Sequence, residues 1–470
     1  MSFKVRNLLP FFYLSLPFFG FCVFAVGQRG IRIDWLIAIV FIHLMTIQLV
    51  SGKLKSIKID SVIISLFLLI FFVSLSIQSP LLSGNSQFLT DFFTTYLQFL
   101  IGTILFLFAY NLKLNESDLK LILKCILLVS GFVSALAILQ LFLSYFGHEL
   151  RLPFTNPGRA LQHSGYEAVT GPVQRSMGTF SEPRQLGAYL LTAISISVAS
   201  LNGNLKLFNK RYLQGILFGL IAAGILCTLS TSAILTMFVF LVFFLFFKLF
   251  VRKNIFRKTI IVRILLLFTI LVLVGSAIYS SPIGTVVVDR IKLPEVGFLN
   301  RHFTELEDKA HRWGAFVRGQ RLGLEAFADY PISGVGLNNF QNFVKANYGD
   351  LFGPTGCHGP LRYLAQTGSL GIIGFGIFLL SLIVKLQKKR RRVVSMEQKE
   401  MLDLGFLIIA VSLFACFASG LYSLVSVFFW GNLVLVGLIL NCYRENRVNC
   451  QLSAMKPSIF STRGRGSGAT

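Results

Sequence analysis

Two arginines and a glutamate stand directly before an apolar run of this sequence. In RSMGTFSEPRQLGAYLL, residues 175–191, the apolar run begins at Leu186, and Arg175, Glu182 and Arg184 precede it. Charges so close to a membrane segment are costly unless they lie at the interface or have a function there. A helix N-terminus presents free N–H groups and a positive dipole end, so arginines beside it favour an anionic group. The pattern therefore suggests a phosphate or diphosphate site at a membrane surface.

The same pattern occurs a second time along the chain. Apolar residues recur at three- and four-residue intervals in residues 302–327, which predicts an amphipathic helix that Pro331 ends. A Gly-rich turn with Gly334 and Gly336 follows. The stretch GPTGCHGPLRYLAQTG then leads from a loop into an apolar run, with His358 at its start.

Arginines of the two segments are the candidate ligands of the anionic group. They are Arg175, Arg184, Arg312, Arg318, Arg321 and Arg362. The alternative is that these side chains are solvated or pair along their own helix. Asp308 with Arg312 and Arg321 with Glu325 have the i,i+4 spacing that such pairs need. Spacing alone leaves both interpretations open.

Two residues are candidates for proton transfer. His358 has the intrinsic pKa of a general base, and the alternative is an interfacial histidine. Glu182 could act as a base or hold an arginine, and the alternative is a first-turn glutamate that favours the helix dipole. The sequence contains no HExxH motif, Walker A motif or Gly-x-Ser-x-Gly motif, so we expect neither a metal nor a cofactor.

Composition identifies the elements that must position these residues. The chain has 470 residues, of which 54% are hydrophobic and 14% charged, whereas soluble domains are about 25% charged. Its apolar residues gather in runs of the length that crosses a bilayer. We therefore expect an all-α integral membrane protein with about twelve transmembrane helices and two large extracytoplasmic segments, similar to membrane glycosyltransferases. The predicted spans are 8–27, 33–50, 61–79, 88–110, 119–146, 185–201, 212–229, 231–250, 264–281, 361–384, 402–420 and 421–441.

The net charge of +24 fits this topology rather than nucleic-acid binding. Most of the lysines and arginines fall in short loops between apolar runs, where they set orientation. The basic run KLQKKRRR is placed inside only if both termini are cytoplasmic. The predicted domains are 1–146 (spans one to five), 147–184 (first outer segment), 185–281 (spans six to nine), 282–360 (second outer segment), 361–442 (spans ten to twelve) and 443–470 (a basic, disordered tail).

The combined motifs resemble those of the O-antigen polymerase/ligase superfamily, bacterial membrane enzymes that act on lipid-linked glycans. The resemblance covers most of the chain in architecture. The matching residues are R-x-x-G-T-F-x-E-P (Arg175, Gly178, Thr179, Phe180, Glu182, Pro183), P-x-x-G-V-G (Pro331, Gly334, Val335, Gly336) and His358 followed by L-x-x-x-G-x-x-G (Leu364, Gly368, Gly371).

The resemblance implies a metal-independent glycosyltransferase reaction. A glycan on undecaprenyl diphosphate is the donor, an acceptor glycan supplies the attacking hydroxyl, and the lipid diphosphate leaves. Arg175 and one arginine of the second segment would stabilise that diphosphate. His358, or alternatively Glu182, would take the acceptor proton. Gly334 and Gly336 would either let the backbone approach the sugar or turn the chain between the helix and the site. Gly178 and Pro183 would shape the loop of the first motif.

The same resemblance implies the location and the partners. The protein is expected in the bacterial cytoplasmic (inner) membrane, with its site facing the periplasm or exterior. Its partners would be the undecaprenyl-diphosphate-linked glycan, the acceptor glycan and membrane lipid, with a chain-length regulator protein as a further partner. The E-P-R form of the first motif favours a polymerase of O-antigen, capsule or exopolysaccharide repeats over a ligase that transfers glycan to lipid A–core or protein.

A flippase or exporter of the same lipid-linked glycan is the alternative from another class. A transporter is expected to carry charges near the middle of its helices, whereas here they lie at helix ends.

The sequence departs from the family pattern in two places. The arginine of the second segment usually lies closer to the proline than Arg312 does, which leaves Arg312, Arg318 and Arg321 as rivals. The turn around Ser230, where many relatives carry an arginine, has none in this chain.

Overall fold

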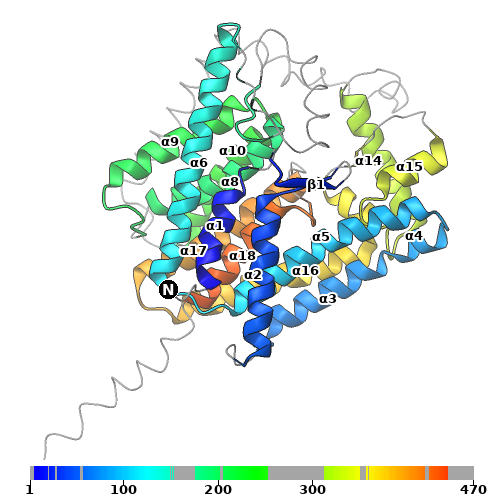
Figure 1. Cartoon of the computed structure of the whole chain (residues 1–470), viewed down its shortest axis with the longest axis horizontal. Coiled ribbons are helices and arrows are strands. Elements are labelled where there is room, and N and C mark those ends of the chain that lie inside the picture. The colour runs from blue at the N-terminus through cyan, green and yellow to red at the C-terminus, as the bar shows by residue number, and fades with distance from the viewer. Residues whose placement is uncertain are drawn as a thin grey trace, which may run out of the picture.

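The computed structural model describes residues 5–18, 21–26, 29–52, 57–148, 150, 152, 175–180, 182–201, 205–251, 312–349, 356–357, 359–418 and 423–442. Helices make up most of these ranges (Figure 1). Five are long and apolar enough to cross a membrane: α2 (Ile33–Val50), α3 with α4 (Ser61–Leu75 and Gln78–Leu82), α5 (Ser86–Asn111), α6 (Glu116–Tyr145) and α16 (Pro360–Arg392).

Further helices complete the fold. Three are apolar: α9 (Arg211–Cys227), α10 (Thr231–Val251) and α18 (Val427–Cys442). The others are α8 (Pro183–Leu201), α14 (Arg312–Asp329), α15 (Phe340–Tyr348) and α17 (Met396–Leu413), which continues as a π-helical turn (Phe414–Ala418). The structure thus confirms a mainly helical protein, and its long apolar helices are consistent with an all-α membrane protein, while the number of twelve spans stays a prediction. The predicted span 264–281 lies outside the described residues.

The first predicted span, 8–27, does not form one helix. A 3₁₀ turn (Val5–Asn7) leads into α1 (Leu8–Ser15), and β1 (Phe24–Val26) then pairs antiparallel with β2 (Arg29–Ile31). The cause is Pro17, which follows two residues after α1 and cannot continue a helix. At 1.5 Å per residue, α1 is about 12 Å long, far less than a bilayer. Hydropathy alone did not separate this helix from the hairpin.

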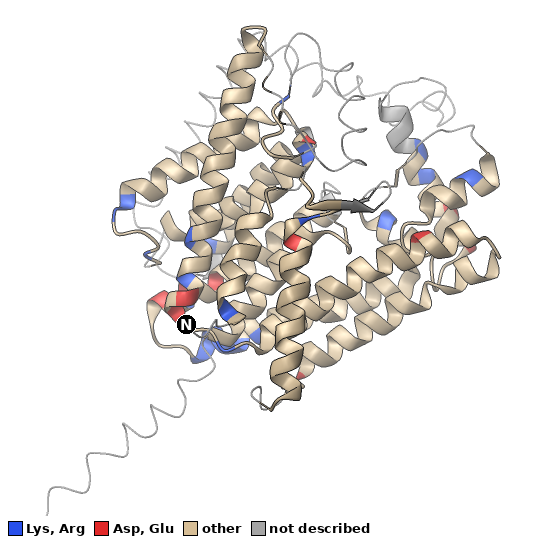
Figure 2. Ribbon diagram, in the orientation of Figure 1, with Lys and Arg blue, Asp and Glu red and all other residues tan. Residues whose placement is uncertain are grey.

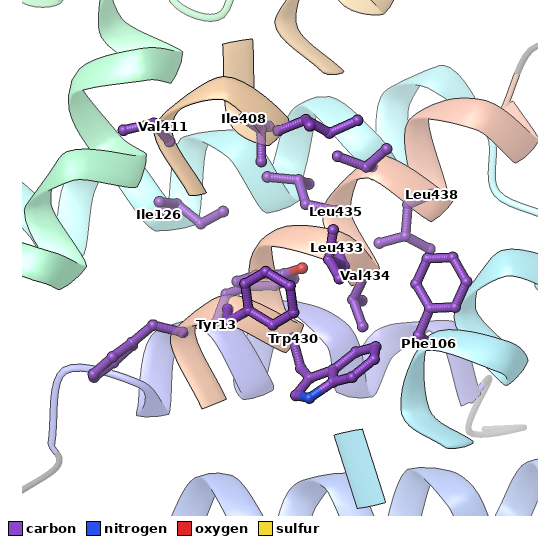
Figure 3. Close-up of a cluster of buried hydrophobic side chains, with 14 of the residues drawn as sticks. Tyr13, Phe106, Ile126, Ile408, Val411, Trp430, Leu433, Val434, Leu435 and Leu438 are labelled. Carbon is purple, nitrogen blue, oxygen red and sulfur yellow. The ribbon is translucent and has the colours of Figure 1, made fainter. Parts of the chain in front are cut away.

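The centre of the fold is α18. Every residue of α18 from Phe428 to Asn441 is buried. Figure 3 shows side chains of four other helices around it: Tyr13 of α1, Phe106 of α5, Ile126 of α6, and Ile408 and Val411 of α17. The second central helix is α8, which is buried from Leu186 to Ser200. Because α8 begins at Pro183, the last residue of the first motif, the motif is attached directly to a buried helix of the fold.

Charged residues gather at two ends of the helices. Figure 2 shows them around the N label, where α6, α16 and α17 begin or end, and on α14 and α15 at the far side. We call the first group the basic end. Ion pairs join helices there: Arg6 to Asp118 at 2.9 Å, Lys120 to Glu397 at 2.7 Å, and Arg390 to Asp403 at 2.5 Å. The orientation of this end towards the cytoplasm stays a prediction.

A small second core lies under α14 and α15. It is formed by Leu322, Ala326, Val335, Phe340, Phe343, Val344, Cys357 and Ala365. The predicted amphipathic helix is therefore confirmed from Arg312 to Asp329, with Pro331 following its end. Residues 302–311 lie outside the described residues.

Candidate functional site

Residues 175–180 of the first motif lie between α6 and the end of α9, and they turn at Met177–Phe180, where the Phe180 N–H donates to the Met177 carbonyl at 2.9 Å. On one side they contact α6, where the Ser176 hydroxyl donates to the Ala137 carbonyl at 2.6 Å. The side-chain amide of Gln140, one turn further along α6, accepts hydrogen bonds from the backbone of Met177 (3.1 Å) and Gly178 (2.7 Å). The Thr179 hydroxyl donates to the Pro17 carbonyl at 2.5 Å. All of these contacts hold the backbone of the motif in place.

Arg175 lies at the opposite side of this segment, against the end of α9. Its Nε donates to the Thr228 carbonyl at 3.2 Å, and the Ser176 backbone N–H donates to the Cys227 carbonyl at 3.3 Å. Arg175 is half-buried. The turn from Thr228 to Ser230, which carries no arginine of its own, is therefore the place where Arg175 is held. Leu229 in this turn has a φ of +47°, which keeps the turn tight.

Two helix N-termini meet beside Arg175. A Cβ on Gly187, in the second turn of α8, would lie 2.3 Å from the Cβ of Ala233 in the first turn of α10. The starts of α8 and α10 thus pack against each other, and each helix start has a positive dipole end. Arg184 is half-buried in the first turn of α8. An anionic group would be favoured here by one or two arginines and by both helix ends.

Glu182 and Pro183 form the start of α8. Pro183 occupies the first helical position, where its missing N–H costs nothing. The Glu182 carbonyl accepts the first helical hydrogen bonds, from the backbone of Gln185 (3.1 Å) and Leu186 (3.3 Å). Glu182 therefore stands at the N-cap position, one residue before the first turn in which the sequence placed it. A carboxylate there interacts favourably with the helix dipole and also lies close to the candidate anion site.

The second motif is held by backbone contacts to a break in α16. Gly368 interrupts the helical conformation with a φ of +64°, and the carbonyls and N–H groups that the break exposes pair with the loop after α14. The four hydrogen bonds are Val335 N to Ala365 O (2.8 Å), Gly336 N to Gln366 O (3.1 Å), Ser369 N to Pro331 O (2.9 Å) and Leu370 N to Ile332 O (3.3 Å). The P-x-x-G-V-G stretch thus forms a short backbone ladder with α16.

The glycines of this ladder approach each other closely. A Cβ on Gly334 would lie 2.5 Å from the Gln366 carbonyl carbon, and a Cβ on Gly368 would lie 2.2 Å from the Ile332 carbonyl oxygen. Gly336 packs on Pro80 of α4, where a Cβ would lie 2.7 Å from Cγ. Of the two roles expected for Gly334 and Gly336, these contacts favour turning the chain between helix and loop. The alternative, an approach of backbone to a sugar, stays a prediction.

The arginines of the second segment differ in their surroundings. The Arg321 side chain is 53% exposed and pairs with Glu325 at 3.1 Å, the i,i+4 partner that the alternative interpretation names. Glu325 also accepts a hydrogen bond from Tyr348, and this bond raises the pKa of the Tyr348 phenol. Arg318 is half-buried on the same helix. Arg312 is the first residue of α14, and its side chain lies outside the described residues.

Arg362 lies in the first turn of α16, where it is half-buried. Next to it, the Tyr363 ring stacks on the Phe375 ring with 5.9 Å between the ring centroids. The Phe375 ring in turn contacts Phe429 of α18, with 5.7 Å between the centroids. His358, the candidate base two residues before α16, lies outside the described residues. Its role therefore stays a prediction.

The two motifs converge on the first turn of α18. Phe180 of the first motif contacts Phe428 at 5.9 Å, while the start of α16 reaches the neighbouring Phe429 through Tyr363 and Phe375. Two segments separated by more than 150 residues are thus anchored on adjacent residues of one buried helix. The arginines Arg175 and Arg184 belong to the α8 side, and Arg362 belongs to the α16 side.

Gln140 is a residue that the sequence interpretation missed. It lies inside the predicted apolar span 119–146, and a polar side chain within such a run is the signal that could have found it. Thr228 contributes through its carbonyl, which no sequence pattern reveals.

No group of three or more His, Cys, Asp or Glu side chains that could hold a metal occurs within the described ranges. The chain matches no protein-family model, and no curated protein matches it.

Proposed function

We propose that the chain is a glycosyltransferase that polymerises oligosaccharide repeats carried on undecaprenyl diphosphate, at the outer side of the bacterial cytoplasmic membrane. The observation that supports this most strongly is the placement of Arg175 where the N-termini of α8 and α10 touch. The proposed site lies at the N-terminal ends of the buried helix α8 and the partly exposed helix α10, away from the basic end. Such a site suits the diphosphate of a lipid carrier whose chain lies in the bilayer.

The proposed reaction is the transfer of a glycan from its carrier to an acceptor hydroxyl. The hydroxyl oxygen forms a bond to the anomeric carbon while the bond from that carbon to the diphosphate oxygen breaks. The electron pair leaves with the diphosphate, and the proton goes to His358 or, alternatively, to Glu182. Arg175, together with Arg184 of the first turn of α8, stabilises the charge that grows on the leaving diphosphate.

A second cationic group is proposed from the other motif. Arg321 is the weakest of the rivals because it is exposed and its guanidinium pairs with Glu325. Arg312, Arg318 and Arg362 remain, and Arg362 has the support of its place at the start of α16, which is anchored beside the first motif. Arginines from the two segments would together bind both phosphates of one carrier.

A glycan size profile tests the function. A strain lacking the gene is complemented with the wild-type chain, with Arg175→Ala, with Arg175→Lys or with the control Arg321→Ala, at matched protein levels. We expect single repeats without long chains in the deletion strain and in Arg175→Ala, partial recovery in Arg175→Lys, and long chains in the control. Lysine keeps the charge but not the planar fork of the guanidinium.

The other outcomes overturn the proposal in different ways. Long chains that persist but stay on the lipid carrier would identify a ligase. Carrier-linked repeats trapped on the cytoplasmic side would identify a flippase. Full output from both Arg175→Ala and His358→Ala would show that the site is assigned wrongly.

A further inference from the structure

Gln140 makes an unusual set of contacts for a side chain in an apolar helix. Its Oε1 accepts from the backbone N–H groups of Met177 (3.1 Å) and Gly178 (2.7 Å). Its Nε2 donates to the carbonyl of Gly178 at 3.2 Å and to that of Leu150 at 3.4 Å. One amide therefore binds the start and the end of the segment that joins α6 to α8.

The chemistry of these contacts requires an amide. Gly178 offers both an N–H and a carbonyl to the same side chain, so the partner must accept and donate within one planar group, as a peptide does. A carboxylate of the same length accepts but cannot donate. A leucine can neither accept nor donate. It would leave the buried N–H groups of Met177 and Gly178 without this acceptor, and an unsatisfied buried donor costs free energy.

The position of Gln140 connects it to Arg175. Arg175 precedes Met177 by two residues, and the short segment between them is held from both sides, by α6 through Ala137 and Gln140 and by the end of α9 through Cys227 and Thr228. A shift of the Gly178 peptide would move the backbone of Arg175 relative to the Thr228 carbonyl that its guanidinium contacts.

We infer that Gln140 is a positioning residue that sets the guanidinium of Arg175 for the anionic leaving group, by clamping the Met177–Gly178 peptide on α6. The inference rests on the proposed function and deepens it, because it names a residue outside both motifs on which the same site depends. Gln140 itself contacts no reacting atom and acts only through Arg175.

The closing experiment compares the purified wild-type chain with Gln140→Leu, Gln140→Glu, Arg175→Ala and the double variant Gln140→Leu/Arg175→Ala. The donor is a short glycan on a polyprenyl diphosphate, and the readouts are kcat/KM for that donor and the melting temperature in detergent. Gln98→Leu is the matched control, since Gln98 is a half-buried glutamine of the apolar helix α5 that lines a pocket with Asp34 and Trp35.

We expect Gln140→Leu to lower kcat/KM about tenfold or more, the factor that one lost and uncompensated hydrogen-bond clamp produces. Gln140→Glu keeps the two acceptor contacts and should lose less. Because Gln140 acts through Arg175, the double variant should be no worse than Arg175→Ala alone. Gln98→Leu should keep wild-type kcat/KM.

Two results would overturn the inference. One is wild-type kcat/KM in Gln140→Leu while Arg175→Ala is inactive. The other is losses that multiply in the double variant and follow the melting temperature, which is the result of a purely structural role. If Gln140→Leu does not fold, the same comparison is made with Gln140→Glu. Full activity of Arg175→Ala would instead refute the proposed function, so the two failures are distinguishable.

Discussion

The two motif regions of this protein are fixed by different means. The first motif is held by side chains, namely Gln140, Ser176 and Thr179, which bond to backbone groups on the surface of the large core. The second motif is held by its own backbone, which pairs with the broken helix α16 above a small separate core. Both regions place arginines at the start of a helix, so similar placement is reached by different packing.

The difference teaches which substitutions each region can accept. Side-chain clamps can be weakened one bond at a time, because the helices that carry them are packed independently of the motif. A backbone ladder depends on two segments of the chain that approach more closely than any Cβ allows. A single added methyl group therefore disturbs all of its hydrogen bonds together. We therefore expect a single substitution to lower stability by a large amount in the second region and by a smaller amount in the first.

The largest effect is expected for Gly368→Ala. The new Cβ would stand 2.2 Å from the Ile332 carbonyl oxygen at a φ of +64°, so the loop and α16 must separate. We expect a loss of about 3 kcal/mol or more of stability, or failure to fold, from the combined clash and backbone strain. Melting temperature and folded yield in detergent are the measurements.

The matched control is Gly376→Ala on the same helix, where a Cβ meets nothing within 4 Å and no positive φ is required. Because alanine is the better helix former, this variant should be more stable by about 0.5–1 kcal/mol. Equal losses of stability in both variants would show that α16 tolerates alanine at neither glycine. The contrast between the backbone ladder of the second motif and the side-chain contacts of the first would then disappear.

A smaller effect is expected for Gly178→Ala in the first motif. Its φ is +57°, but the atoms nearest to a Cβ are the side-chain carbons Val133 Cγ1 at 2.9 Å and Leu186 Cδ2 at 3.3 Å, which can move. We expect a loss of about 1–2 kcal/mol, mostly from the left-handed backbone. Gly147→Ala, at φ +79° with open space around it, measures that backbone part alone. A loss at Gly178 as large as at Gly368 would contradict the comparison.

The sequence predicted the parts of the fold that depend on local pattern. Period and length identified the apolar helices, and Pro331 correctly marked the end of α14, because these signals are carried by neighbouring residues. The same signals failed at Pro17, where a hydrophobic run continues through a helix end and a hairpin. Hydropathy does not detect the change from helix to hairpin, because the residues of both elements are apolar.

The candidate site was predictable in its residue types and not in its contacts. Arg175, Glu182 and Gly334 stand out because charge before an apolar run and glycine after a helix have local causes. The partner of Arg175 is a carbonyl of Thr228, and the partner of Gly334 is the backbone of α16. Main-chain groups are the same in every residue, so a single sequence holds no record of which one is used.

The smallest effect is expected for Arg321→Gln, and the same substitution at Arg175 provides the contrast between the two regions. Arg321 is 53% exposed and pairs with Glu325 along its own helix, so Arg321→Gln should change stability by less than about 0.5 kcal/mol after solvent screening. Arg175 is half-buried and bonded to the Thr228 carbonyl, so Arg175→Gln should lose about 1.5–3 kcal/mol, the range for hydrogen bonds of charged groups. The melting temperatures of the two variants, compared in one detergent, measure the difference. An Arg321→Gln variant could have the melting temperature of the wild type and yet make no long glycan. That result would place Arg321 in the diphosphate site in spite of its ion pair. The second region would then contribute to the chemistry through an exposed arginine, whereas the first region uses an arginine that is hydrogen-bonded to the backbone.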